Sequence, residues 1–224
     1  KEYEQEIEGK FVLLAGDLLI DADILNARLG ECLPPLEVRE NGTIQIWKPP
    51  VVGVKYCAGA DCADEGGGGV NALIIMDSQT GEEMAEINAD VAADKFAISA
   101  FTLLSEYNHA LVAPERNGTT GGMVIQKLKD MSYDNIYIDE EGKEGWYSKP
   151  NSYFPKIDRF RMLKEYEEAV RLRRTVIRSS DAIGELSTFV LNDKGKYDHR
   201  EGYKSDRVMA RAICWQIRKS SQGR

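Results

Sequence analysis

The chain has 224 residues, of which 42% are hydrophobic, enough for one sizeable hydrophobic core or at most two small ones. It contains no run approaching the roughly 18 to 20 apolar residues of a membrane span, and its charged opening, Lys1–Glu4, does not resemble a secretion signal. We therefore expect an intracellular protein with no membrane partner.

The net charge of −8 argues against a nucleic-acid partner, because duplex binding depends on basic residues that displace condensed counterions. Several of the 29 lysines and arginines nevertheless gather in two late segments, Lys156–Arg161 and Arg171–Arg174. Each segment can form a local basic surface on an acidic chain, or it can be a solvated helix face. The net charge alone therefore does not exclude nucleic acid.

The four cysteines, at positions 32, 57, 62 and 214, include no Cys-x-x-Cys pair and have no histidine cluster nearby. This distribution favours reduced thiols over a disulfide framework or a zinc site.

The first part of the chain, residues 1–49, is mixed and acidic, and it is interrupted by Pro34-Pro35 and Pro49-Pro50. We expect it to be a linker segment packed on the domain, which leaves residues 50–224 as the main domain.

Three strands are predicted next, because short apolar stretches alternate with turn residues. They cover residues 51–61, 72–77 and 84–89, and the last two are joined by a tight turn at residues 78–82.

Helical periodicity then appears between further short apolar runs, which indicates that helices and strands alternate. The expected elements are a helix at 93–107, a strand at 109–113, a helix at 118–129, a strand at 135–138, a hairpin around Gly142, a helix at 158–173, a strand at 175–177 and a helix at 205–219.

This order predicts an α/β fold with a ribonuclease-H-like mixed central sheet, in which three antiparallel strands come first and helices cover both faces. Acids far apart in sequence would meet at one end of adjacent central strands. Two carboxylates about 4 Å apart repel by roughly 4 kcal/mol at an effective dielectric of about 20, so such a cluster needs a cation. Oxygen ligands without histidine or cysteine favour Mg²⁺ or Mn²⁺.

Three acids fit these positions. Asp61 ends the first predicted strand among small neighbours, although an aspartate there can also cap a loop. Glu115 follows the fourth strand, where it can instead be a surface acid paired with Arg116. Asp206 opens the last helix on the same stripe as Met209, which suggests that it faces the sheet, although it can also serve only the helix dipole.

Four stretches of the chain form a recognisable combination, namely Tyr56–Asp61, Ala72–Asp77, Tyr107–Asn117 and Asp206–Ala212. Together they resemble the nuclease domain of phage large terminases, and the resemblance runs from about residue 44 to 217. A further stretch, Glu185–Phe189, is similar to the Glu-Leu-x-x-Phe segment that precedes the last acid of the family.

The resemblance implies a nuclease that cuts concatemeric viral DNA in the host cytoplasm, with Asp61 bridging two metal ions and Glu115 and Asp206 each binding one. It implies double-stranded DNA, an ATPase half, a small terminase subunit and a portal or procapsid as partners. No Gly-x-x-x-x-Gly-Lys-[Ser/Thr] loop is present, so we do not expect this chain to hydrolyse ATP.

The chain departs from the family pattern in two places. The family commonly ends in His-Asp-Asp where this chain has Lys204-Ser205-Asp206, and many relatives carry an aspartate near Asn71. Asp64, Asn71, Lys204 and Ser205 are therefore only auxiliary candidates, Asp64 through a water molecule and Lys204 through a phosphate contact.

Other functions remain open from the residues alone. Within nucleases, a Holliday-junction resolvase or an integrase-like enzyme is the nearest alternative. Outside them, the chain can be a non-catalytic module that docks on a packaging motor. An actin-like ATPase would need a second copy of the fold and glycine-rich phosphate loops.

Overall fold

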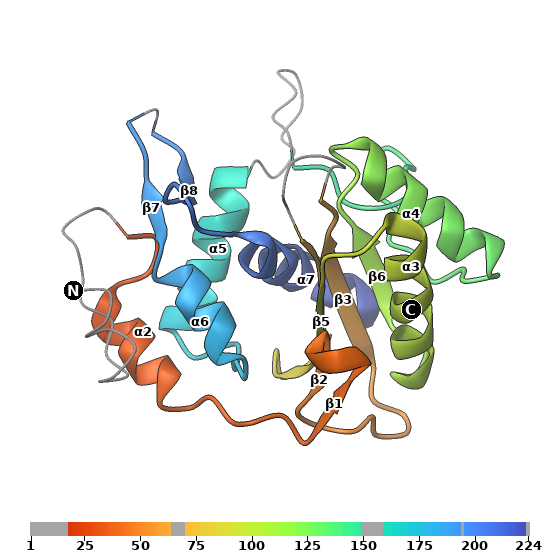
Figure 1. Ribbon diagram of the computed structural model, residues 1–224, viewed down its shortest axis with the longest axis horizontal. Helices are drawn as coiled ribbons and strands as arrows, with labels where there is room; N and C mark the ends of the chain where they lie inside the picture. Colours follow the sequence, from red (N-terminus) through yellow and green to blue (C-terminus); the bar gives the residue numbers. More distant parts are fainter. Residues whose placement is uncertain (1–17, 64–69, 149–158, 194, 223–224) are drawn as a thin grey trace.

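The computed structural model describes residues 18–63, 70–148, 159–193 and 195–222. A six-stranded mixed sheet lies between two layers of helices (Figure 1). The strands follow the order β1-β2-β5-β4-β3-β6 across the sheet. They are β1 (Glu37–Arg39), β2 (Ile44–Ile46), β3 (Tyr56–Asp61), β4 (Asn71–Asp77), β5 (Glu83–Ala89) and β6 (Leu111–Pro114).

The sheet is buried on both faces, which explains the continuous apolar runs of its central strands. One face packs against α3 (Ala93–Glu106) and α4 (Thr119–Asp130), and the other packs mainly against α7 (Asp206–Gln222) and α5 (Arg159–Arg171). Strands β3, β4 and β5 form the predicted antiparallel meander, and β6 joins β3 in parallel. These features confirm the predicted fold class, with helices on both faces.

The first strand is shorter than predicted. Residues 51–54 form a turn in which the Val54 N–H donates to the Val51 carbonyl and Gly53 has a φ of 83°. Because this turn diverts the backbone from the ladder, β3 begins only at Tyr56.

The segment before residue 50 contributes more to the sheet than the sequence suggested. It supplies α2 (Ala22–Leu29), the short 3-10 turn η1 (Glu40–Gly42) and strands β1 and β2, of which β2 pairs antiparallel with β5. The two strands have only three residues each, too few to produce a clear alternating pattern.

Two predicted strands are wrong as regular elements. Ile136 and Val176 each form only an isolated bridge, with Val112 and Glu82 respectively. Three short elements beyond α5 were not predicted, namely α6 (Ser180–Leu186), β7 (Phe189–Leu191) and β8 (Tyr197–His199). The β7–β8 pair forms a separate hairpin at the upper left of Figure 1.

None of the helices in the described ranges combines the length and the apolar composition needed to cross a membrane.

The contact between β3 and α7 depends on Gly59. A Cβ atom at this position would lie 2.2 Å from the Ala210 carbonyl oxygen and 2.4 Å from the Cys214 backbone nitrogen. Because both are backbone atoms, they cannot move aside without shifting α7. Glycine therefore sets how closely the last helix approaches the central strand.

We expect Gly59→Ala to destabilise the protein by an amount at the upper end of the roughly 1–3 kcal/mol typical of overpacking. Urea denaturation of the two proteins measures this difference. The control is Gly184→Ala, where a Cβ atom would meet no atom within 4 Å and alanine is the better helix former. Equal stability of Gly59→Ala and the wild type would contradict the close packing of α7 on β3.

Candidate metal-binding site

Asp61 and Glu115 lie at the same edge of the sheet because their strands are parallel neighbours. Ala60 pairs with Pro114 in the register, and the Glu115 N–H donates to the Ala60 carbonyl at 2.8 Å. Each acid is therefore the next residue after a paired position. The structure brings together two of the acids that the sequence singled out, although 53 residues separate them (115 − 61 − 1).

The carboxyl groups of Asp61 and Glu115 interact directly. Burial raises the pKa of Asp61 well above its ordinary value, and the charge of Glu115 and a hydrogen bond to Glu115 raise it further. The charge of Asp206 acts in the same direction, whereas the charge of Arg159 lowers the pKa. Glu115 and Asp206 therefore both lie within electrostatic range of Asp61.

Asp206 reaches this edge through the packing of α7. Its carboxylate accepts a hydrogen bond from the backbone N–H of Val70, the residue that precedes β4. The first residues of β4 run alongside Asp61, since Ala72 is the partner of Asp61 in the register. Burial raises the pKa of Asp206, and this hydrogen bond and the charges of Lys204 and His199 oppose the effect.

The start of α7 is held by glutamates from other elements. Glu185 accepts hydrogen bonds from both the backbone N–H and the guanidinium of Arg207, each at 2.9 Å. The Arg207 Nε also donates to Glu86 at 2.8 Å. Glu185, which belongs to the Glu-Leu-x-x-Phe segment, thus satisfies an unpaired amide of the first helical turn and fixes the residue next to Asp206.

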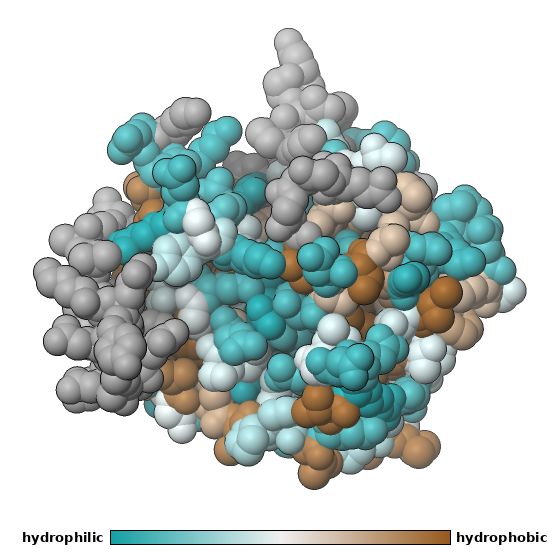
Figure 2. All heavy atoms as spheres, in the orientation of Figure 1, coloured by the Kyte–Doolittle hydropathy of each residue, from teal (hydrophilic) through white to brown (hydrophobic). Residues whose placement is uncertain are grey.

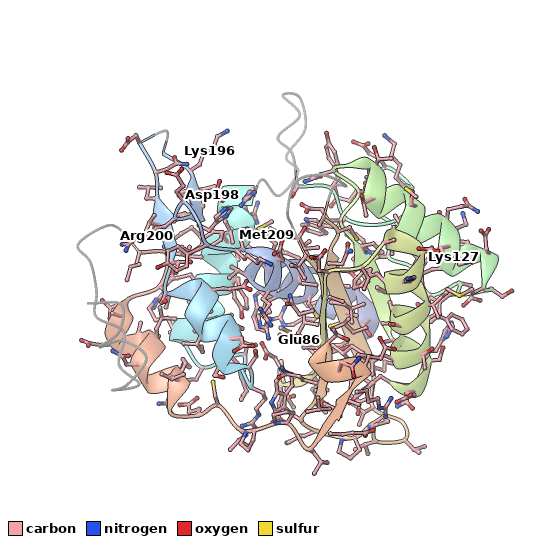
Figure 3. The ribbon with its side chains drawn as sticks, viewed as in Figure 1. Glu86, Lys127, Lys196, Asp198, Arg200 and Met209 are labelled. Carbon is pink, nitrogen blue, oxygen red and sulfur yellow. The ribbon has the colours of Figure 1, made fainter. Side chains whose placement is uncertain are left out.

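A buried ion pair continues this contact along α7. Arg211 donates to Glu83 at 2.7 Å and to Glu86 at 2.6 Å, and the side chains of Arg211, Glu83 and Glu86 are exposed by 0%, 0% and 2%. Figure 3 labels Glu86 on β5 and Met209 on α7, and Met209 lies between Arg207 and Arg211 in the sequence. Sequence reasoning missed this pair because the glutamates of β5 carry no local sign that they are buried rather than exposed.

An irregularity in β5 puts both glutamates on the face toward α7. Glu83 pairs with Met76 and Glu86 with Ile74, and Met84 is the extra residue between them. Met76 and Ile74 both belong to the core cluster that contains α7. In a regular strand, residues three apart would point to opposite faces, so the bulge is required for the pair.

The side chain of Glu115 does not pair with Arg116, the alternative that the sequence left open. Arg116 instead forms an ion pair with Asp139, and its guanidinium lies 5.1 Å from the centre of the Tyr147 ring. Two residues that sequence reasoning did not single out hold the carboxylate. Asn117 Nδ2 donates to Glu115 Oε1 at 2.7 Å, and the Ser148 hydroxyl donates to the same oxygen.

The auxiliary candidates have other partners or lie apart. The buried Asn71 accepts from the Ala63 N–H at 3.1 Å and donates to the Val91 carbonyl at 2.8 Å, which ties the backbone around the site. The backbone carbonyl of Ser205 accepts a hydrogen bond from the Met209 N–H. Lys204 is exposed, and its charge lowers the pKa of Asp206. Asp64 lies outside the described residues.

The chemistry of the donor set fits a hard divalent cation. Two carboxyl groups that share a hydrogen bond require a proton between them, and a cation removes the same repulsion. Within the described residues, no group of three or more His, Cys, Asp or Glu side chains is arranged so that it could hold a metal ion. Asp61 and Glu115 are in contact, and Asp206 acts on Asp61 through its charge.

The two basic segments lie at different ends of the molecule. Arg159, the described end of the first segment, acts on Asp61 through its charge. Residues 171–174 instead lie toward the opposite end, where the carbonyl of Arg174 is close to Gly81 in the β4–β5 turn. Arg171, Arg173 and Arg174 form ion pairs with glutamates there, so the second segment is a charged surface away from the acids.

Comparisons with known proteins give structural but no sequence relatives. No protein-family model matches the chain. No curated protein matches it either.

Several solved structures share the fold. The magnesium-bound large terminase nuclease from thermophilic phage G20c matches with a TM-score of 0.66 and 15% identity over 91% of this chain and 98% of that one. The cobalt-bound form matches with a TM-score of 0.64 and 16% identity, over 91% of this chain and 98% of that one. The Thermus phage P74-26 large terminase nuclease domain matches with a TM-score of 0.58 and 16% identity, over 87% of this chain and 94% of that one. The ribonuclease-H-like fold and the resemblance to terminase nuclease domains are therefore confirmed at the level of the fold.

Proposed function

We propose that this chain, which has the fold of phage large terminase nuclease domains, is a metal-dependent endonuclease that cuts double-stranded DNA during viral genome packaging. The observation that supports the proposal is the contact between Asp61 and Glu115 at one edge of the sheet, with Asp61 also within range of the charge of Asp206. Acids that repel one another in a partly buried site reduce stability, and such sites are typical of function.

Asp61, Glu115 and Asp206 are the residues that would hold Mg²⁺ or Mn²⁺, as one or two ions. When held there, such ions would supply Lewis-acid chemistry for phosphodiester hydrolysis, by activating a water and stabilising the departing oxygen. Asp61 contacts Glu115 and is influenced by Asp206, so it is the acid suited to bridge two ions. Structures of the G20c nuclease with magnesium, cobalt and zinc support divalent-ion binding by this fold.

Basic side chains around the acids would hold the phosphate backbone. Arg159 lies near Asp61, and Lys204 lies near Asp206. Lys196 and Arg200 extend from the β7–β8 hairpin (Figure 3), where hydrophilic side chains predominate on the visible face (Figure 2). Contacts with phosphates position a duplex without reading its bases, which predicts cleavage of low sequence specificity.

The hairpin is anchored against the rest of the molecule. The Tyr197 ring stacks on Phe160 of α5 with 5.4 Å between ring centroids, and Lys164 Nζ lies 5.8 Å from the centre of the same ring. Arg159 also pairs with Asp198 of the hairpin at 3.3 Å. The hairpin and the start of α5 are therefore packed together, and His199 of the hairpin acts on Asp206 through its charge.

The other partners follow from the proposed role. An ATPase half, a small terminase subunit and a portal or procapsid would act with this chain in the host cytoplasm. The chain itself supplies the hydrolytic site.

The proposal is tested by incubating the purified chain with supercoiled plasmid and Mg²⁺ or Mn²⁺. We expect nicking that EDTA abolishes and that Asp206→Asn reduces by at least about 10²-fold, since a metal ligand is worth several kcal/mol of transition-state stabilisation.

The matched control is Asp130→Asn, an exposed acid at the last position of α4, about 17 Å along that helix from its start beside Glu115. It is expected to nick at the wild-type rate. Metal-independent nicking, or equal rates for Asp206→Asn and Asp130→Asn, would reject the proposal. A preference for four-way junctions over linear duplex would indicate a resolvase instead.

A further inference from the structure

The carboxylate of Glu115 is held by hydrogen bonds from Asn117 and Ser148, which also bond to each other. Asn117 Nδ2 donates to Glu115 Oε1 at 2.7 Å and to Ser148 Oγ at 2.5 Å. The Ser148 hydroxyl donates in turn to Glu115 Oε1, and the Ser148 N–H donates to Asn117 Oδ1 at 3.0 Å. Each of the three side chains is thus fixed by the other two.

The backbone of Ser148 determines how the Asn117 amide is oriented. A backbone N–H can only donate, so the oxygen of the Asn117 amide must face Ser148 and its NH₂ group must face Glu115. The serine hydroxyl then accepts from the amide and keeps its own proton for Glu115. Both donors reach the same oxygen, Oε1, which leaves Oε2 for a cation.

Ser148 is brought to Glu115 by a backbone connection rather than by chance proximity. The Trp146 N–H donates to the Pro114 carbonyl, and the Arg116 N–H donates to the Trp146 carbonyl, each at 2.8 Å. Trp146 is buried, and so is Ser148, with only 3% of its surface exposed. The segment 146–148 therefore runs along the residues on both sides of Glu115.

Gly121 secures the other side of the same turn. A Cβ atom there would lie 1.8 Å from the Glu115 carbonyl oxygen. The start of α4 consequently packs directly on the backbone of Glu115, so the acid is fixed from its main chain as well as from its side chain.

We infer that Ser148 is a positioning residue for the metal-binding carboxylate of Glu115, with Asn117 as the residue that orients the serine hydroxyl. This inference rests on the proposed function, because it assigns Ser148 a role toward the metal ions of that site. Hydrogen-bonded outer partners of a ligand typically contribute about 10–100-fold to metal affinity or activity. Ser148 has no role in contacting DNA under this inference.

The test is calorimetric titration of the metal-free chain with MnCl₂, with Ser148→Ala compared to the wild type. We expect the Kd for Mn²⁺ to rise by about 10-fold in the variant, and Asn117→Ala to raise it in the same direction.

The matched control is Ser221→Ala. Ser221 is also buried, and its hydroxyl donates one hydrogen bond, to the Tyr56 carbonyl at 3.0 Å. Tyr56 begins the strand that Asp61 ends, so the control lies about 17 Å from the acids. Both serine variants are expected to lose similar thermal stability in EDTA, and only Ser148→Ala is expected to lose Mn²⁺ affinity.

The outcomes separate the two ideas. If the wild type binds Mn²⁺ and Ser148→Ala binds it equally well, the positioning role is wrong and the proposed function is unaffected. If the wild type itself binds no Mn²⁺, the metal site of the proposed function fails, and the role of Ser148 fails with it.

Discussion

Replacement of Asp61 by asparagine is expected to lower the rate of DNA nicking by roughly 10³-fold, which corresponds to about 4 kcal/mol of transition-state stabilisation. The amide keeps the size of the side chain and removes the charge that would hold the metal ions. A plasmid-nicking time course with Mn²⁺ in excess measures the change.

The same substitution is expected to stabilise the metal-free protein by about 0.5–2 kcal/mol, as is common where a functional site is built at a cost in stability. Asp61 is partly buried against Glu115, and the charge of Asp206 adds to the repulsion. Removing the charge at Asp61 relieves that repulsion only when no cation is present. Thermal unfolding in EDTA measures the gain, and added Mn²⁺ should stabilise the wild type more than the variant.

Asp77→Asn is the matched control for Asp61→Asn. Asp77 ends β4 at the opposite edge of the sheet, where its Oδ1 accepts the N–H groups of Gln79 and Thr80. This control should lose a little stability and keep its nicking rate. An Asp61→Asn protein that is less stable than the wild type in EDTA, or that still nicks at the wild-type rate, would contradict the repulsive acid cluster.

Replacement of Arg211 by methionine is expected to destabilise the protein by about 3–5 kcal/mol at neutral pH, because buried Glu83 loses its guanidinium partner and buried Glu86 keeps only Arg207. The guanidinium lies between Glu83 and Glu86, and all three side chains are essentially inaccessible to solvent. Guanidinium chloride denaturation of both proteins measures the difference. Arg161→Met, which removes an exposed i,i+4 pair with Glu165, is the control and should cost at most about 0.5 kcal/mol.

The cost of Arg211→Met should shrink as the pH falls. In the wild type, burial raises the pKa of Glu86, but Arg211 and Arg207 outweigh burial and hold that pKa below its ordinary value of 4.5. A depressed pKa contributes stability above pH 4.5, and this contribution is lost as the pH falls through the folded-state value. In the variant, burial instead favours the protonated form, so its stability should improve relative to the wild type on going from pH 7 to about pH 4. A difference that stays constant with pH would rule out unpaired carboxylates as its cause.

The long elements of the fold were predictable because each leaves a strong local pattern. The β3–β4–β5 meander and helices α3, α4 and α7 are long enough for their apolar spacing to be visible. Strands β1, β2, β7 and β8 have three residues each, and what fixes them is their partner rather than their own sequence. Isolated bridges such as that of Ile136 belong to the same class.

The proximity of Asp61 and Glu115 was predictable because the order of the strands places them side by side. Asp61 and Glu115 end parallel neighbours, and this position follows from the predicted topology alone. Their surroundings were not predictable. Ser148 reaches Glu115 through a backbone bridge at Trp146, and Glu83 and Glu86 share a face only because of a bulge. Neither feature has a periodic signal in the sequence.

The basic segments show where local composition misleads. Arg159 lies near Asp61, whereas Arg173 and Arg174 pair with glutamates at the other end of the molecule. Both segments look alike in sequence, and only the direction of α5 separates them. One end of that helix faces the acids, and the other end faces the β4–β5 turn.

The binding of metal by these acids is tested most directly by anomalous diffraction at the manganese absorption edge from crystals soaked in MnCl₂. We predict an anomalous peak about 2 Å from the carboxylate oxygens of Asp61 and of Glu115 or Asp206. No peak beside Asp61, with manganese bound only by other acids, would contradict the assignment of these residues as the hydrolytic site.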